Sequence, residues 1–99
     1  MTSPSSSSGL KTADAAIRVD KAIATGVQII TDGTNDATLV LYDNASAASG
    51  TEIFKIVVTG TDDAIPINLP NNGVYCKNGI YADVTVGGGG TVGYIVYFR

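Results

Sequence analysis

Two segments within residues 77–99 carry apolar residues at every second position. Apolar residues occupy the even positions of 80–86, and Tyr81, Asp83 and Thr85 lie between them. The even positions of 91–98 are apolar as well. This period is typical of a strand with one buried face. Because four glycines separate the two patterned segments, the pattern predicts a β-hairpin. The second strand is apolar on both faces, which favours a central place in a sandwich or burial under a neighbouring subunit.

The middle of the chain carries the same type of pattern in shorter pieces. Turn-forming residues such as Asp32-Gly33, Gly60 to Asp63, Pro70 to Gly73 and Asn78-Gly79 separate them. Pro66 assigns its strand to a sheet edge, since proline cannot donate to the ladder. We therefore predict an all-β fold, a small β-sandwich or jelly roll of seven or eight strands. The predicted strands before the closing pair are 25–31, 37–43, 51–59, 64–69 and 74–77.

The N-terminal residues differ from the rest in composition. Residues 1–9 are mostly serine, so they cannot bury apolar area and are expected to be disordered in an isolated monomer. Over 13–29 the odd positions are mostly apolar, which predicts an extended arm or edge strand over 13–24, with a helix over 12–22 as the alternative. The predicted organisation is an extended N-terminal arm, 1–24, and a β-sandwich domain, 25–99.

Charge and size exclude several classes of function. The chain has 99 residues, enough for one domain, and a net charge of −3. Residues 31–99 carry all of the acidic excess, a sum of −4 against +1 for residues 1–30, which argues against non-specific nucleic-acid binding. No apolar run reaches the length of a membrane span, and no signal-peptide pattern is present, so we expect a protein made and used without secretion. Cys76 is the single cysteine and is expected to be a buried hydrophobe.

The residues that usually carry catalysis are scarce. The chain has no histidine, which excludes histidine-based acid–base chemistry and histidine metal sites, and one cysteine cannot form a thiolate zinc site. The G-x-G-x-x-G match at 88–93 precedes a strand, whereas a dinucleotide site needs a following helix. The aspartates lie mostly in turns, where they cap backbone groups. We expect no catalytic, metal or cofactor site, and the tyrosines are best explained as core or subunit interface.

Three segments together resemble small virion proteins of tailed bacteriophages, of the capsid decoration (cement) class. They are TDGTNDATLVLYDNASAASGTEIF (31–54), KNGIYADV (77–84) and YIVYF (94–98). The resemblance covers roughly residues 25–99. It implies a compact β-sandwich or jelly roll, often trimeric, that lies where capsomers meet. Cement proteins have no active site and act by burying surface across joints between shell subunits.

On this basis we expect a homotrimer on the outside of an icosahedral phage capsid, made in the host cytoplasm. Its partners would be the major capsid protein and further copies of itself, with no nucleic acid and no membrane. The arm is expected to contact the shell or a neighbour, and sheet faces are expected to form the subunit interface. The alternatives are a neck, tail or fibre component, and a carbohydrate-binding module that uses surface tyrosines. The predicted arm contacts are Leu10, Lys11, Ile17, Arg18, Val19 and Ile23, and the predicted interface residues are Tyr81, Ile95 and Tyr97.

Overall fold

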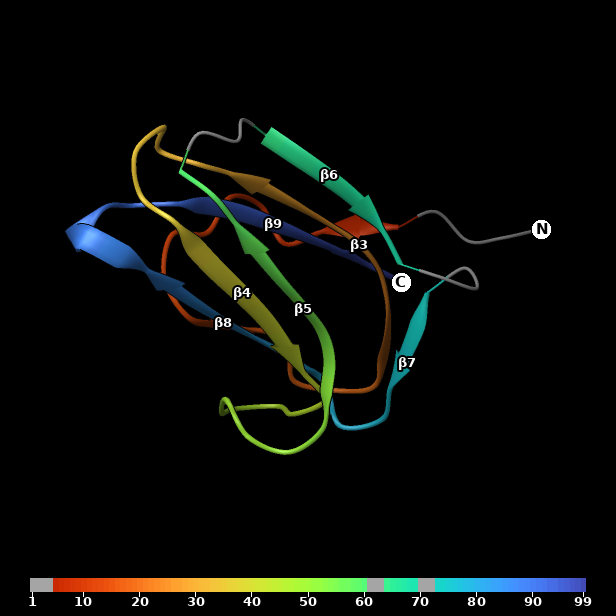
Figure 1. Cartoon of the computed structure of the whole chain (residues 1–99). Coiled ribbons are helices and arrows are strands. Elements are labelled where there is room, and N and C mark those ends of the chain that lie inside the picture. Colours follow the sequence, from red (N-terminus) through yellow and green to blue (C-terminus); the bar gives the residue numbers. More distant parts are fainter. Residues whose placement is uncertain (1–4, 61–63, 70–72) are drawn as a thin grey trace.

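The computed structural model describes residues 5–60, 64–69 and 73–99, and within these ranges it is built almost entirely of β-strands (Figure 1). The all-β prediction is confirmed. The expectation for Met1 to Pro4, and the turns predicted over 61–63 and 70–72, lie outside the described residues. The strands are β1 (Ser6–Ser7), β2 (Ala15–Arg18), β3 (Ala22–Ile30), β4 (Ala37–Tyr42), β5 (Glu52–Val58), β6 (Ala64–Asn68), β7 (Val74–Cys76), β8 (Ile80–Val86) and β9 (Gly93–Phe98).

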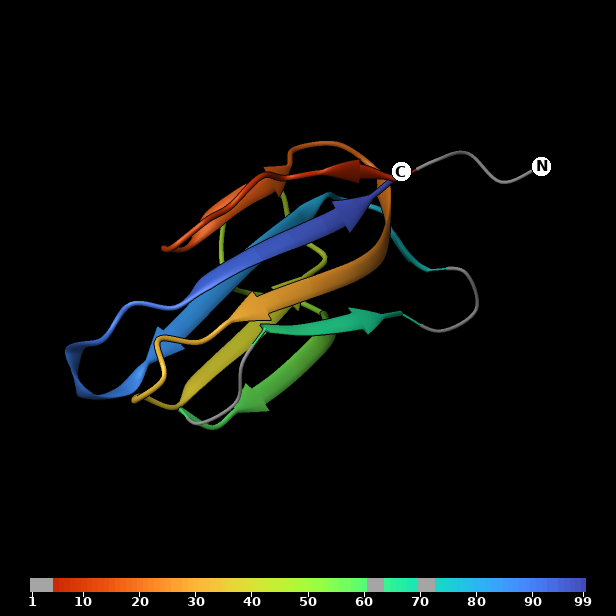
Figure 2. The same cartoon turned by 90° about the horizontal axis from the view of Figure 1, so that it is seen from above.

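The strands form two antiparallel sheets stacked face to face (Figure 2). The first sheet has the order β1-β9-β3-β6, with β7 also paired to β3, and the second has the order β2-β8-β4-β5. β6 and β7 pair with successive parts of one edge of β3 and act as one interrupted strand. Each early strand therefore pairs with its late counterpart: β4 with β5, β3 with β6 and β7, β2 with β8, and β1 with β9. This arrangement, a long hairpin rolled into two sheets, is a jelly roll.

The core lies between the two sheets and is filled by alternate residues of their strands. Tyr94, at 0% exposure, is the largest fully buried side chain among the described residues. Ile80 and Ala82 from β8 and Val96 from β9 are buried with it, as their even positions predict. Cys76 is buried and unpaired, as expected. Pro66 lies in β6 at the edge of the first sheet, which also confirms the prediction from sequence.

The predicted closing hairpin is wrong, because β8 and β9 belong to different sheets. β8 pairs with β4 and β2, and β9 pairs with β3 and β1. The glycines between them form a 3-10 turn, Gly87–Gly89, that crosses from one sheet to the other. Gly88 has a φ of 61°, which favours glycine, and the Gly87 N–H donates to the Asp36 carbonyl at 3.0 Å. Asn78-Gly79 likewise crosses between sheets and does not close a two-residue hairpin.

The N-terminal segment pairs with the body of its own chain. Ser6 and Ser7 pair with Phe98 and Tyr97, and the Ser8 N–H donates to the Val96 carbonyl at 2.9 Å. The expectation of disorder is therefore wrong for residues 5–9, because backbone pairing at a sheet edge needs no apolar side chain. β2 confirms an extended edge strand and excludes the alternative helix. The predicted boundary between residues 24 and 25 falls inside β3. None of the described residues forms a helix long and apolar enough to cross a membrane.

Candidate interaction surfaces

The N-terminal segment, residues 5–21, closes one open side of the sandwich, and we call this side the arm edge. The backbone of Lys11 exchanges two hydrogen bonds of 2.9 Å with that of Tyr94. The Tyr94 hydroxyl donates to the Ala13 carbonyl at 2.6 Å, and the Asp14 carboxylate accepts the Val84 N–H at 2.8 Å. These bonds hold the arm edge to both sheets of its own chain.

The predicted arm residues divide into four groups. Ile17 packs against the core and Lys11 is half-buried, so they also attach the arm to the body. Leu10 is 61% exposed and Val19 is 74% exposed, so their side chains are available to a partner. The Arg18 guanidinium lies 5.7 Å from the centre of the Phe98 ring, close enough for a cation–π contact. Ile23 lies outside the arm edge, in β3 of the first sheet, where it pairs with Tyr75 of β7.

The strands of the first sheet present neutral side chains on its outer face, and Arg99, whose backbone exchanges hydrogen bonds of 2.8 and 2.9 Å with that of Ile23, directly follows β9. The strands of this sheet, β1, β3, β6, β7 and β9, contain no Asp, Glu, Lys or Arg over their described ranges. Ile95 pairs with Gln28 and Tyr97 pairs with Gly26, at positions that alternate with the buried Val96. Tyr75, 61% exposed, pairs with Ile23 on the same sheet. The predicted interface residues Ile95 and Tyr97 therefore share one neutral face, which we call the neutral face.

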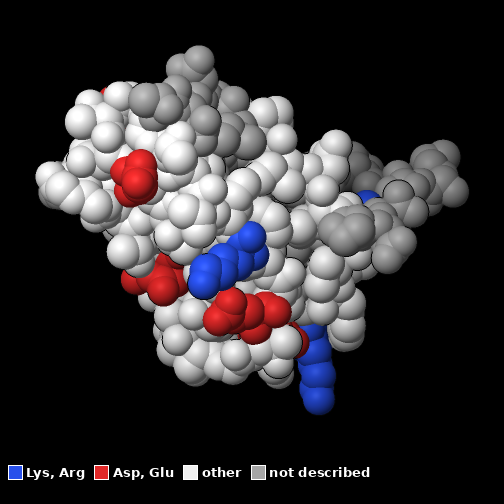
Figure 3. Space-filling model, in the orientation of Figure 1, with Lys and Arg blue, Asp and Glu red and all other residues white. Residues whose placement is uncertain are grey.

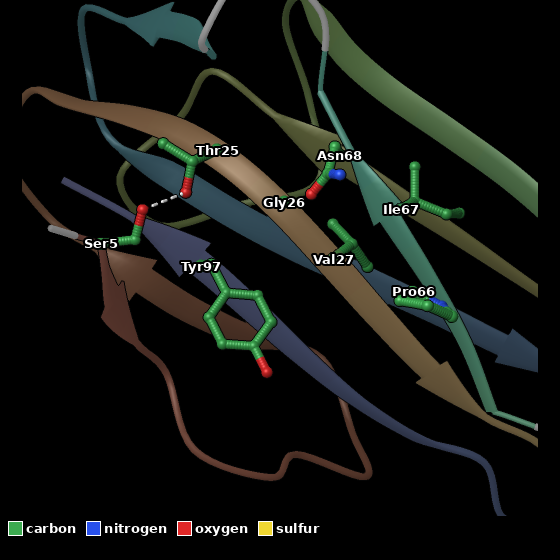
Figure 4. A pocket seen from close by; sticks show the side chains of 8 residues that line it. All are labelled: Ser5, Thr25, Gly26, Val27, Pro66, Ile67, Asn68 and Tyr97. Carbon is green, nitrogen blue, oxygen red and sulfur yellow. Dashed lines mark hydrogen bonds between the residues drawn. The ribbon is translucent and has the colours of Figure 1, made fainter. Parts of the chain in front are cut away.

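A pocket of about 220 Å³ opens on the neutral face (Figure 4). The ring of Tyr97 and the Ser5 side chain lie on one side of it, and β6 lies on the other. Ser5 and Thr25 share a hydrogen bond of 2.7 Å between their hydroxyl oxygens. A Cβ on Gly26 would lie 3.0 Å from the Ile67 carbonyl oxygen and 3.8 Å from the Tyr97 ring, so the absent side chain keeps this region open. The lining residues are Ser5, Thr25, Gly26, Val27, Pro66, Ile67, Asn68 and Tyr97.

The third predicted interface residue, Tyr81, lies on the opposite side of the molecule. It belongs to β8 in the second sheet and pairs with Tyr42. That sheet carries charge: Lys55 and Asp83 pair with Val40 from its two sides, and basic and acidic side chains lie next to each other in Figure 3. On one protomer, Tyr81 therefore lies on a different surface from Ile95 and Tyr97.

A pair of carboxyl groups lies where the arm edge meets the second sheet. Partial burial raises the pKa of Asp83, and the neighbouring Asp14 carboxylate, which shares a hydrogen bond with it, raises this pKa further. Burial raises the pKa of the Tyr94 hydroxyl to about 12, and Asp14 adds to the effect. Repulsion from a close carboxylate favours the protonated form of Asp83. The protonation of Asp83 therefore depends on its contact with Asp14 of the arm edge.

The aspartate-rich turn after β3 serves the fold. The Asn35 side chain donates to Asp32, and the Thr34 and Asn35 N–H groups donate to Asp32 Oδ1 at 2.8 Å, which together lower the pKa of Asp32 to about 2. The Gly60 N–H donates to Asp36 Oδ1 at 2.9 Å. These contacts confirm the prediction of turn capping for Asp32 and Asp36. Asp62 and Asp63 lie outside the described residues, and the described part of the chain contains no group of three or more potential metal ligands.

Several residues of these surfaces were not predicted from the sequence. Ser5 lies in a serine run without periodicity, and Thr25 and Asn68 carry no signal until the strands are paired. Tyr75 could have been found from its alternation with Cys76. No family model matches the chain, and no curated protein and no solved structure is significantly similar to it.

Proposed function

We propose that this protein is a capsid decoration protein of a tailed bacteriophage, which binds at joints between major capsid protein subunits and stabilises the head shell. The resemblance of residues 31–54, 77–84 and 94–98 to that class supports the proposal. The jelly-roll architecture is one that viral capsid proteins use. In this proposal the protein acts as a trimer on the capsid surface, and its contribution is buried area without chemistry.

The observation that carries the proposal is the composition of the arm edge. Leu10 and Val19 are two large apolar side chains more than half exposed, and burying each against a partner contributes about 1.5–3 kcal/mol. Lys11, Arg18 and Lys21 are three of the six basic residues of an acidic chain and lie in the same segment. Apolar side chains with a rim of charge are typical of a protein interface. In this proposal the arm edge is the part of the protein that contacts the shell.

Substitutions in the arm edge and at the β5 edge of the second sheet test this proposal. The variant L10S/V19S removes the apolar contacts of the arm edge, while V57S changes a valine of similar exposure, 65%, on β5 at the opposite edge. We expect L10S/V19S to bind undecorated capsids at least about tenfold more weakly, since one lost side-chain contact already exceeds 1.4 kcal/mol. V57S should bind as the unmodified protein does. The measurements are occupancy by quantitative mass spectrometry and the melting temperature of the capsid.

Unchanged occupancy and unchanged capsid melting with L10S/V19S would remove the arm edge from the mechanism. Deleting residues 1–14 is a less specific test, because it also removes β1 and the hydrogen bonds to Tyr94 and Val84. The number of copies in purified virions separates the proposal from its nearest alternative. A decoration protein is present in many copies around the head, whereas a neck, tail or fibre component is present in few.

A further inference from the structure

We propose that the pocket on the neutral face binds one ring of an uncharged sugar. Ser5 is the one residue that this site shares with the arm edge, and the exposed side chains of Leu10 and Val19 are not part of its lining. The proposal rests on the composition of the pocket, on its shape and on its neutral lining.

The lining combines one aromatic ring with several neutral polar groups. Tyr97 and Pro66 offer apolar surface, while Asn68, Ser5 and Thr25 offer an amide and two hydroxyl groups. A sugar ring has the same dual character, with apolar C–H faces and a rim of hydroxyl groups. A wholly apolar ligand would cover the Asn68 amide without offering it a hydrogen bond, which is costly.

The absence of charge narrows the class of ligand further. The strands that form the first sheet contain no Asp, Glu, Lys or Arg over their described ranges, and the eight lining residues are all neutral. A charged ligand would lose hydration in the pocket without gaining an opposite charge. The ligand class that remains is neutral and rich in hydroxyl groups, which excludes uronic and sialic acids.

The shape of the pocket suits one ring. The Tyr97 ring is on one wall, the residues of β6 are on the other, and Gly26 lies between them (Figure 4). The volume of about 220 Å³ equals that of roughly seven water molecules at ~30 Å³ each. This is room for one sugar ring. The Ser5–Thr25 hydrogen bond orients both hydroxyl groups and leaves each oxygen able to accept a further hydrogen bond.

The test is a titration of the isotope-labelled full chain with D-glucose, D-galactose and N-acetyl-D-glucosamine, each to about 50 mM, with amide resonances as the readout. We expect saturable shifts at Gly26 and Asn68 for at least one sugar, with a Kd in the millimolar range. Both Y97A and N68A should weaken binding about tenfold or more, and Y97F, which keeps the ring, should retain it. Y81A, which changes a tyrosine on the opposite sheet, is the matched control.

Three outcomes overturn the proposal. The first is that the amide chemical shifts change linearly with the concentration of every sugar. The second is saturable binding that survives both Y97A and N68A. The third is that N68A converts an oligomer to a monomer in light scattering. The last result would make the neutral face an interface between copies. N68A changes an exposed side chain, so it tests the pocket even if Y97A fails to fold. None of these outcomes affects the arm edge, so the two proposals fail separately.

Discussion

Replacing Gly79 by alanine should destabilise the protein through the arm edge. Gly79 has a φ of 132°, and a Cβ there would overlap the carbonyl oxygen of Arg18 in β2 and lie 3.2 Å from the Cα of Ala45. The conflict is with backbone atoms, so no side-chain rotation relieves it. The left-handed conformation costs about 1–2 kcal/mol for alanine, and crowding of a packed site adds about 1–3 kcal/mol. We expect a loss of about 2–5 kcal/mol in the free energy of unfolding.

Gly33 provides the matched control for this substitution. Its φ is 85°, also left-handed, but an added Cβ would have no heavy atom within 4 Å. G33A should therefore cost only the conformational part, about 1–2 kcal/mol. The difference in the free energy of unfolding between G79A and G33A therefore measures the steric conflict between residue 79 and the Arg18 carbonyl of β2.

Urea unfolding followed by circular dichroism measures both variants, and hydrogen exchange locates the effect. In G79A, the amides of β2 should exchange faster relative to those of β4, because the displaced carbonyl belongs to β2. G33A should leave the ratio between the two strands unchanged. If G79A costs no more than G33A, or if β2 and β4 lose protection equally, then Gly79 does not hold the arm edge against the body.

Two further predictions concern ionisable groups. Because the folded pKa of Asp83 is raised above its ordinary value of 3.8, the carboxyl group stabilises the fold at acid pH, and this contribution is lost as pH rises through the folded value. D83N cannot ionise at this position and does not lose this contribution. The melting temperature of D83N relative to that of the unmodified protein should therefore be higher at pH 7 than at pH 4, and an equal difference at both pH values would contradict this. Burial raises the pKa of the Cys76 thiol to about 11, so at pH 8 it should react with a thiol reagent only at the rate of unfolding, and immediate reaction in the folded state would contradict this.

Which residues are buried could be predicted from the sequence, because burial follows from local alternation. The even positions of 91–98 predict that Val92, Tyr94 and Val96 are inside, and all three are at 0% exposure. Pro66 alone predicts an edge strand, because proline has no N–H group to donate to a neighbouring strand. These conclusions need only the period of the pattern and the chemistry of single side chains.

Which strands pair could not be predicted in the same way. The alternation around Gly87 to Gly90 is satisfied equally by a hairpin and by a crossing between sheets, because both bury the same residues. The crossing is favoured by distant partners: β8 packs between β2 and β4, and β9 between β1 and β3. Tyr81 and Tyr97 both occupy outward positions of their strands, and only the pairing places them on opposite faces of the sandwich. The interface residues predicted from the sequence therefore lie on two different surfaces of one protomer.

The rolled topology also explains why both candidate surfaces depend on residues far apart in the chain. β1 pairs with β9, so Ser5 comes to lie at the pocket that contains Tyr97, and Lys11 is held by Tyr94. The bond from Tyr94 to Ala13 joins the same two segments. The arm edge and the pocket therefore both require the pairing of residues 6–11 with residues 94–98. A change that breaks this pairing should weaken shell binding and sugar binding together, whereas L10S/V19S and N68A should each affect one of them.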